Sequence, residues 1–201
     1  RDSYVHITKR SAEGVVISGV KAIVTGGPYM HELLVMPCRT MRKEDADFAI
    51  CCAVPIDAKG LTIISRPAGR PGEAEAEFSS KYGQSVAVCH FDQVFVPWDQ
   101  VFFAGEHEYT EHLVTSYANH HRHSCIGARA GFGDLLIGAG ALMTEANGLD
   151  METVPHLRDS MAELIKLVEG FFACGVAASV YGIQDPCGSW MPEPVFSNVG
   201  K

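Results

Sequence analysis

Short apolar runs separated by polar breaks characterise the first half of the chain. Seven runs rich in β-branched residues occur at residues 4–7, 14–26, 32–37, 48–55, 61–67, 85–91 and 93–97. Clusters of Gly, Pro, Asp and Lys separate them, which is typical of antiparallel strands joined by turns. The pattern therefore predicts an antiparallel β-barrel or sandwich. A surface loop is predicted at residues 66–80, which are rich in Gly, Pro and charge.

The second half of the chain follows a helical period instead. Apolar residues recur at helical spacing from about residue 107 to 147, and a break at 147–155 precedes a second such segment at 155–181. Thr153 is available as the N-cap of the second helix, because Pro155 suits a first-turn position. We therefore expect an α+β fold, with a β domain at residues 1–100 and helices at residues 101–201. Ligands often bind where two such domains meet.

Composition and charge narrow the kinds of partner and compartment. The net charge of −8 and the pI near 5.5 argue against binding to nucleic acid or to an anionic membrane surface. The seven cysteines are odd in number and irregularly spaced, so we expect reduced thiols in the cytoplasm. No signal peptide is visible, and the longest uncharged apolar stretch, 170–183, is too short to span a bilayer. The chain starts directly in a strand pattern and stops without a helix cap or a polar tail, so we expect an internal piece of a longer protein.

The densest group of candidate ligands is YANHHRHSCIGARAGFGD, at residues 117–134. On a helix His121 and Cys125 share a face with Ala128, whereas His120 and His123 point elsewhere. A His and a Cys one turn apart supply half of a four-donor site for zinc or an iron–sulfur cluster. No Cys-x-x-Cys pair accompanies them, so spacing alone favours the alternative, a polar helix face that hydrogen-bonds to its neighbours.

Two glycine-containing motifs leave similar alternatives open. Gly131 and Gly133 lie in AGFGD, within the half of the chain that is predicted to be helical. Glycine is unfavourable within a helix, so two glycines here indicate close approach by a ligand or by another helix. Asp134 ends this motif and has no charge partner near it in the sequence. In VTGG, Val24 and Thr25 end a strand, where a Thr hydroxyl and backbone N–H can meet a ring edge or a phosphate. A plain turn is the alternative for that motif.

Four segments together resemble the 4-hydroxyphenylacetate 3-hydroxylase family of flavoproteins, and within it the branch of 4-hydroxybutyryl-CoA dehydratases. They are RDSYVHITKR (1–10), GVKAIVTG (19–26), FDQVFVPWDQVFFAGE (91–106) and YANHHRHS…GFGD (117–134). The resemblance implies the fold of acyl-CoA dehydrogenases, with the middle antiparallel β domain and the first half of the C-terminal helical domain in this chain. It also implies a preceding N-terminal helical domain and a homotetramer built through the C-terminal helices.

The resemblance implies roles for individual residues. Thr25, with its neighbour Val24, and Asp134 correspond to positions at the FAD site. His121 corresponds to the histidine ligand of a [4Fe–4S] cluster and is the candidate for acid/base work beside the flavin. Cys125 is a candidate replacement for a cluster cysteine.

At three further positions the chain departs from the branch. A cluster cysteine corresponds to Ala128, the lysine after it to Arg129, and a catalytic glutamate to Val86. Alanine cannot ligate iron and valine cannot accept a proton, so isomerisation of a double bond is easier to support than loss of a hydroxyl.

The first hypothesis for function is an FAD-dependent enzyme acting on a small acyl-CoA, as a dehydratase or vinylacetyl-CoA isomerase, with or without a complete cluster. A two-component FAD-dependent monooxygenase acting on a phenol is the second, and it requires no iron. The third is a degenerate paralogue that keeps the fold but performs no chemistry.

Overall fold

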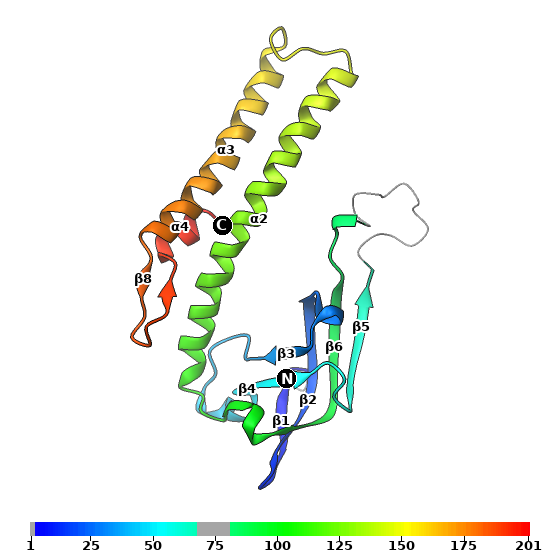
Figure 1. Ribbon diagram of the computed structural model, residues 1–201, viewed down its shortest axis with the longest axis vertical. Helices are drawn as coiled ribbons and strands as arrows, with labels where there is room; N and C mark the ends of the chain where they lie inside the picture. The colour runs from blue at the N-terminus through cyan, green and yellow to red at the C-terminus, as the bar shows by residue number, and fades with distance from the viewer. Residues whose placement is uncertain (1–2, 68–80) are drawn as a thin grey trace. The chain divides into compact units, whose positions relative to one another are not determined.

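The computed structural model describes residues 3–67 and 81–201, so most of the predicted loop at 66–80 lies outside the described residues. The chain forms two compact units, Arg1–Val114 and Thr115–Lys201. The first is made of strands and the second of helices and a small hairpin (Figure 1). This order confirms the predicted α+β class.

Two antiparallel sheets make up the first unit. The larger has the order β1-β2-β6-β5, formed by His6–Arg10, Gly14–Thr25, Val86–Pro97 and Leu61–Arg66. The smaller has the order β3-β4-β7, formed by Glu32–Val35, Ile50–Pro55 and Val101–Ala104. Three short 3-10 helices, Gly27–Tyr29, Lys43–Phe48 and Trp98–Gln100, lie between strands. Every strand pair within the two sheets is antiparallel, as the sequence predicts.

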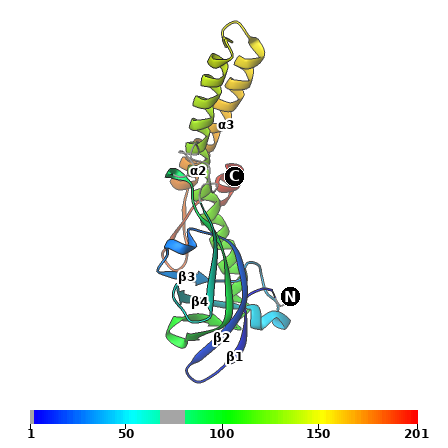
Figure 2. The same ribbon diagram turned by 90° about the vertical axis from the view of Figure 1, so that its right-hand side faces the viewer.

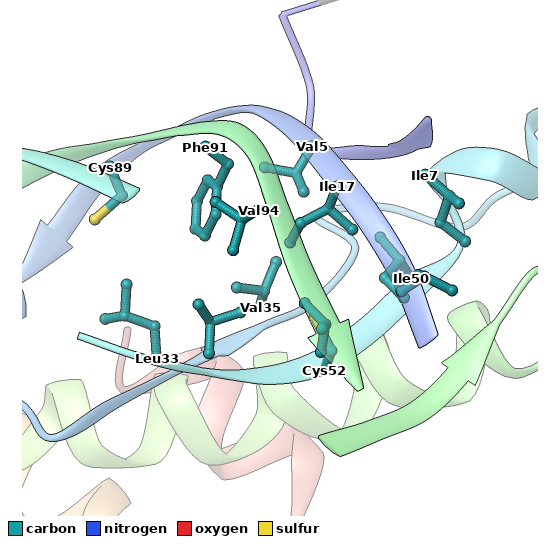
Figure 3. Close-up of a cluster of buried hydrophobic side chains, with 13 residues drawn as sticks. Val5, Ile7, Ile17, Leu33, Val35, Ile50, Cys52, Cys89, Phe91 and Val94 are labelled. Carbon is teal, nitrogen blue, oxygen red and sulfur yellow. The ribbon is translucent and has the colours of Figure 1, made fainter. Parts of the chain in front are cut away.

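The hydrophobic core lies between the inner faces of these sheets. Figure 3 shows Phe91 and Val94 of β6 pointing toward side chains of the other sheet, which include Val35 and Cys52. Among the described residues Phe91 is the largest fully buried side chain, with 1% of its surface exposed. Burying a side chain of this kind contributes roughly 1.5–3 kcal/mol, so β6 is a main source of the stability of this unit.

A β-bulge at Gln93 divides β6 into two halves. Phe91 and Val94 both face the core, although an unbroken strand would place residues three apart on opposite faces. Gln93 has a φ of 51°, and its backbone N–H and Nε2 both donate to Ser18 Oγ, at 3.0 and 2.7 Å. In the facing strand Gly19 has a φ of 134°, and a Cβ there would lie 2.4 Å from a backbone oxygen. The bulge joins the two predicted runs, 85–91 and 93–97, into one strand.

Burial changes the ionisation of Cys52 in β4. Removal from water, with a smaller effect of Cys51, raises the pKa of the Cys52 thiol from 9.0 to about 12. The folded pKa lies above the unfolded one, so the stability from this group is fully present below pH 9 and is lost as the pH rises toward 12. The loss amounts to about 4 kcal/mol at 1.36 kcal/mol per pH unit.

Urea unfolding between pH 8 and 11 should therefore show stability falling more steeply in the wild type than in Cys52→Ala. Equal slopes would contradict this assignment.

The boundary between the units falls between Val114 and Thr115. This is later than the expected boundary at residue 100, because β7 pairs with β4 and so belongs to the first unit. The start of the following helix is also tied to this unit, since Thr110 is fully buried and its Oγ1 accepts a hydrogen bond from Met41 N–H at 2.8 Å.

Two long helices run antiparallel and side by side in the second unit (Figure 2). They are α2, Tyr109–Ala146, whose first residues belong to the first unit, and α3, Pro155–Val180. Both agree with the helices predicted at 107–147 and 155–181. Gly133 of α2 lets α3 approach, because a Cβ there would lie 2.4 Å from the Val168 side chain. The predicted capping by Thr153 is wrong, since Val154 is the N-cap residue and no side chain caps it.

A small hairpin and a short helix follow α3. The hairpin pairs β8, Ile183–Gln184, with β9, Trp190–Met191, and the helix is α4, Pro194–Val199. Each strand of this hairpin has two residues, which is too few to show an alternating pattern in the sequence.

Among the described residues, only α2 has the length and hydropathy of a membrane-spanning helix. Core helices of soluble proteins have the same properties, so these properties do not distinguish the two cases. The expectation of no membrane association stays a prediction.

Candidate functional site

His121 lies on an exposed face of α2 in a column with Tyr117 and Cys125, one helical turn before it and one after it. The Tyr117 and His121 rings are stacked, with centroids 5.6 Å apart and planes 6° apart. Cys125 Sγ lies 3.6 Å from His121 Nε2 and 3.9 Å from Nδ1. A sulfur nearly equidistant from both nitrogens lies over the ring or beside Cε1, and not on the lone-pair axis of either nitrogen. The column therefore fixes the plane of the imidazole and leaves its nitrogens open.

The neighbouring histidines have partners within the second unit. His120 Nε2 lies 3.1 Å from Met191 Sδ. His123 Nε2 lies 3.2 Å from the Gly175 carbonyl oxygen and 3.0 Å from Ser179 Oγ. Within residues 3–67 and 81–201, no hydrogen bond to the His121 ring is found beyond the contacts with Cys125. His121 is therefore the histidine of this cluster that remains available for a ligand or a proton.

Asp134 does not join His121 in one site. The two residues are thirteen positions apart on the same helix, which corresponds to about 20 Å along the axis and to different faces. Asp134 is exposed, whereas Gly133 beside it is buried against Val168. Helix packing thus accounts for Gly133, and Asp134 remains a separate, exposed candidate.

Val24 and Thr25 end β2 in the first unit. Thr25 is exposed and pairs with Val86 of β6, while Val24 is partly buried and pairs with Ala87. The pairing shifts register just before them, and Ile23 at this irregularity has a φ of 59° with 81% of its surface exposed. A left-handed conformation costs roughly 1–2 kcal/mol for a residue with a Cβ. Strain of this kind often accompanies ligand sites, so it supports a functional role for this end of the sheet.

A groove of about 330 Å³ in the second unit lies beside His123. It is lined mainly by apolar and small residues of α2 and α3, including Ile126, Gly127 and Phe172. His123 lies about 200° around the helix from His121, so this groove opens on another side of α2. The groove is therefore not the site of His121.

Too few metal donors meet at the His121 column for a four-donor cluster. No group of three or more His, Cys, Asp and Glu side chains able to hold a metal occurs among the described residues. His121 and Cys125 give two donors, and Ala128, one turn further along the exposed face, gives none. Among the described residues this column therefore does not by itself supply the four donors of a [4Fe–4S] cluster.

Two family models together cover almost the whole chain. The model for the 4-hydroxyphenylacetate 3-hydroxylase N terminal region matches residues 1–103, and the model for the C terminal region of the same enzymes matches residues 110–201. The two matches divide the chain near the start of α2, where the strands give way to helices.

Individual relatives agree with these models. The chain is 32% identical over 206 residues to the 4-hydroxybutyryl-CoA dehydratase/vinylacetyl-CoA-Delta-isomerase of Clostridium aminobutyricum, with 100% of the chain and 42% of that protein covered. The structure of an oxygen-tolerant archaeal 4-hydroxybutyryl-CoA dehydratase from N. maritimus matches with a TM-score of 0.88 and 34% identity, covering 99% of this chain and 40% of that one. The chain therefore spans about two fifths of the length of these relatives.

A more distant likeness confirms the predicted fold. An acyl-CoA dehydrogenase from Geobacillus kaustophilus matches with a TM-score of 0.61 at 16% identity, covering 83% of this chain and 42% of that one. At this identity the match concerns the fold alone.

Proposed function

Because the chain belongs to the 4-hydroxyphenylacetate 3-hydroxylase family, we propose that the whole protein is an FAD-dependent enzyme. Its substrate in this proposal is a small acyl-CoA, and its reaction is the isomerisation of a vinylacetyl-type double bond. The full-chain similarity to a dehydratase/vinylacetyl-CoA isomerase supports this branch of the family. The observation that carries the proposal is the His121 imidazole, held in plane by Tyr117 and Cys125 with its nitrogens open.

The residues of the chain have separate tasks in this reaction. Thr25 and Val24 at the end of β2 are proposed to contact the FAD, which would supply hydrogen or electron transfer when bound. Asp134 of α2 is proposed separately as a residue that contacts a flavin. His121 accepts a proton from the carbon next to the thioester carbonyl and returns one to the far end of the double bond. A fixed ring plane favours this transfer, because the donor and acceptor atoms must stay aligned through the reaction.

Isomerisation is proposed in preference to dehydration, because His121 and Cys125 alone do not complete an iron centre. Removal of the hydroxyl by an iron centre would need donors beyond His121 and Cys125, and Ala128 supplies none. Isomerisation needs no leaving hydroxyl, so beside the flavin it requires of this chain only the proton transfer assigned to His121. Cys125 is not proposed as a metal ligand, because its sulfur lies off both lone-pair axes of His121.

The visible spectrum and iron content of the full-length protein test this proposal. We expect bound FAD at close to one per chain, little iron, and conversion of vinylacetyl-CoA to its conjugated isomer. Four irons per chain would contradict isomerisation without a cluster. The absence of FAD would contradict the flavin enzyme altogether, and FAD binding without turnover of any substrate would favour the degenerate paralogue.

A second candidate is a two-component phenol monooxygenase, which the description of the matching family models favours. It predicts weak binding of FAD, tighter binding of the reduced form, and turnover of 4-hydroxyphenylacetate when a flavin reductase is added. Tight binding of oxidised FAD together with binding of a CoA ester would count against it.

The assembly is proposed to be a cytoplasmic homotetramer built through the helices. Phe172, Val176 and Val180 support this, because they lie one turn apart on α3 and are 60%, 46% and 72% exposed. A continuous exposed apolar stripe of this kind is typical of a surface that another protein segment covers. Light scattering coupled to gel filtration measures the number of subunits.

A further inference from the structure

The strand register brings three distant residues into one row across the larger sheet. Thr25 of β2 and Arg66 of β5 each pair with Val86 of β6, which lies between them. Residues directly opposite in an antiparallel pair project from the same face. Ala87 and Cys89 of β6 are buried in the core, so the row of Val86 lies on the outer face of the sheet.

The row has an apolar centre and a polar group at each end. Val86 and Val88 are partly exposed, and Ile64, which pairs with Val88, is 64% exposed. The exposed hydroxyl of Thr25 lies on one side of this apolar centre and the exposed guanidinium of Arg66 on the other. Because neighbouring strands are about 4.8 Å apart, the two polar residues are separated by about 10 Å. A flat ring lying over Val86 can therefore have one of these side chains at each of two opposite edges.

Arg66 is anchored by its backbone and not by its charge. Its carbonyl oxygen accepts a hydrogen bond at 2.6 Å from the hydroxyl of the buried Ser85. No ion pair engages its guanidinium among residues 3–67 and 81–201. A glutamate at position 86 would lie directly opposite Arg66 and pair with it. Valine at that position offers no such partner, so within residues 3–67 and 81–201 no carboxylate lies opposite the guanidinium.

We propose that Arg66 binds the reduced flavin selectively, by holding the negative charge of its pyrimidine edge at N1 and the C2 carbonyl. In this arrangement the ring lies over Val86, and Thr25 meets the opposite edge. Reduced flavin carries this charge at neutral pH and oxidised flavin does not, so a guanidinium at that edge favours the reduced form. The inference rests on the proposed flavin function and adds a residue that recognises the redox state.

Flavin binding to the full-length protein tests this role without any measurement of turnover. Dissociation constants for oxidised FAD and for dithionite-reduced FAD are measured anaerobically in the wild type, Arg66→Gln and Arg66→Lys. We expect Arg66→Gln to weaken binding of reduced FAD about tenfold more than binding of oxidised FAD, which is the loss of one charge-assisted contact. Arg66→Lys should restore part of this preference, and the midpoint potential of the bound flavin should fall in Arg66→Gln.

Arg39→Gln is the matched control, since Arg39 is an exposed arginine of the same unit outside this row. It should leave the ratio of the two dissociation constants unchanged. An unchanged ratio in Arg66→Gln, or equal weakening of both redox forms, would overturn the role of Arg66 while leaving the flavin enzyme intact. Failure of the wild type to bind FAD in either form would overturn both proposals.

Discussion

Replacing His121 with alanine should lower kcat for isomerisation of vinylacetyl-CoA about 100- to 10,000-fold, the range typical for loss of a general acid/base. The proposal assigns the proton transfer to the imidazole, which is stacked on Tyr117 and touched by Cys125. FAD affinity should change by less than about threefold, because the proposed flavin contacts do not include His121 and an exposed substitution has little effect on the fold. Initial rates at saturating substrate, together with a flavin titration, measure both quantities.

His120→Ala is the matched control for this experiment. His120 is the adjacent exposed histidine of α2, and its imidazole contacts Met191. It should retain kcat within about threefold of the wild type. Equal losses in the two variants would show that the helix tolerates neither change and would remove the special role of His121. Full activity of His121→Ala would contradict that role directly.

The second large effect is expected in the core of the β unit. Phe91→Ala should lower the free energy of unfolding by about 3–5 kcal/mol, because it leaves a cavity where the largest fully buried side chain packs. Phe95→Ala, four residues later on the same strand, removes a side chain that is 50% exposed and should cost about 1 kcal/mol. Urea unfolding followed by circular dichroism measures both variants. Similar losses in the two would contradict the assignment of Phe91 to the core.

Local pattern accounts for much of this fold. The short apolar runs of β2 and β4 and the helical period of α2 and α3 are visible in the sequence, because turn residues bound the runs and each helix buries residues at a regular spacing. The shared face of His121 and Cys125 follows from the same geometry, since residues four apart on a helix lie one above the other. These features depend only on near neighbours in the chain.

Features that depend on distant residues could not be predicted in this way. Gln93 takes its left-handed conformation while bonded to Ser18, which lies 75 residues earlier, so two apparent strands are one. The row of Thr25, Val86 and Arg66 depends on the pairing register of three strands, and this register cannot be deduced from any one of them. The packing of Gly133 against Val168 likewise required the second helix to be in place.

The bulge at Gln93 also determines which changes in length this strand accepts. Deleting Gln93 would leave Phe91, Asp92 and Val94 in regular alternation, so Val94 and Val96 would still face the core. Straightening the strand with all its residues kept would instead turn Val94 and Val96 outward, because every side chain beyond the bulge would change face. A chimaeric gene that joins two parents within residues 91–94 therefore has to keep the bulge wherever it keeps the extra residue. Crossovers placed outside β6 avoid this constraint, because they exchange the strand and its bulge as one piece.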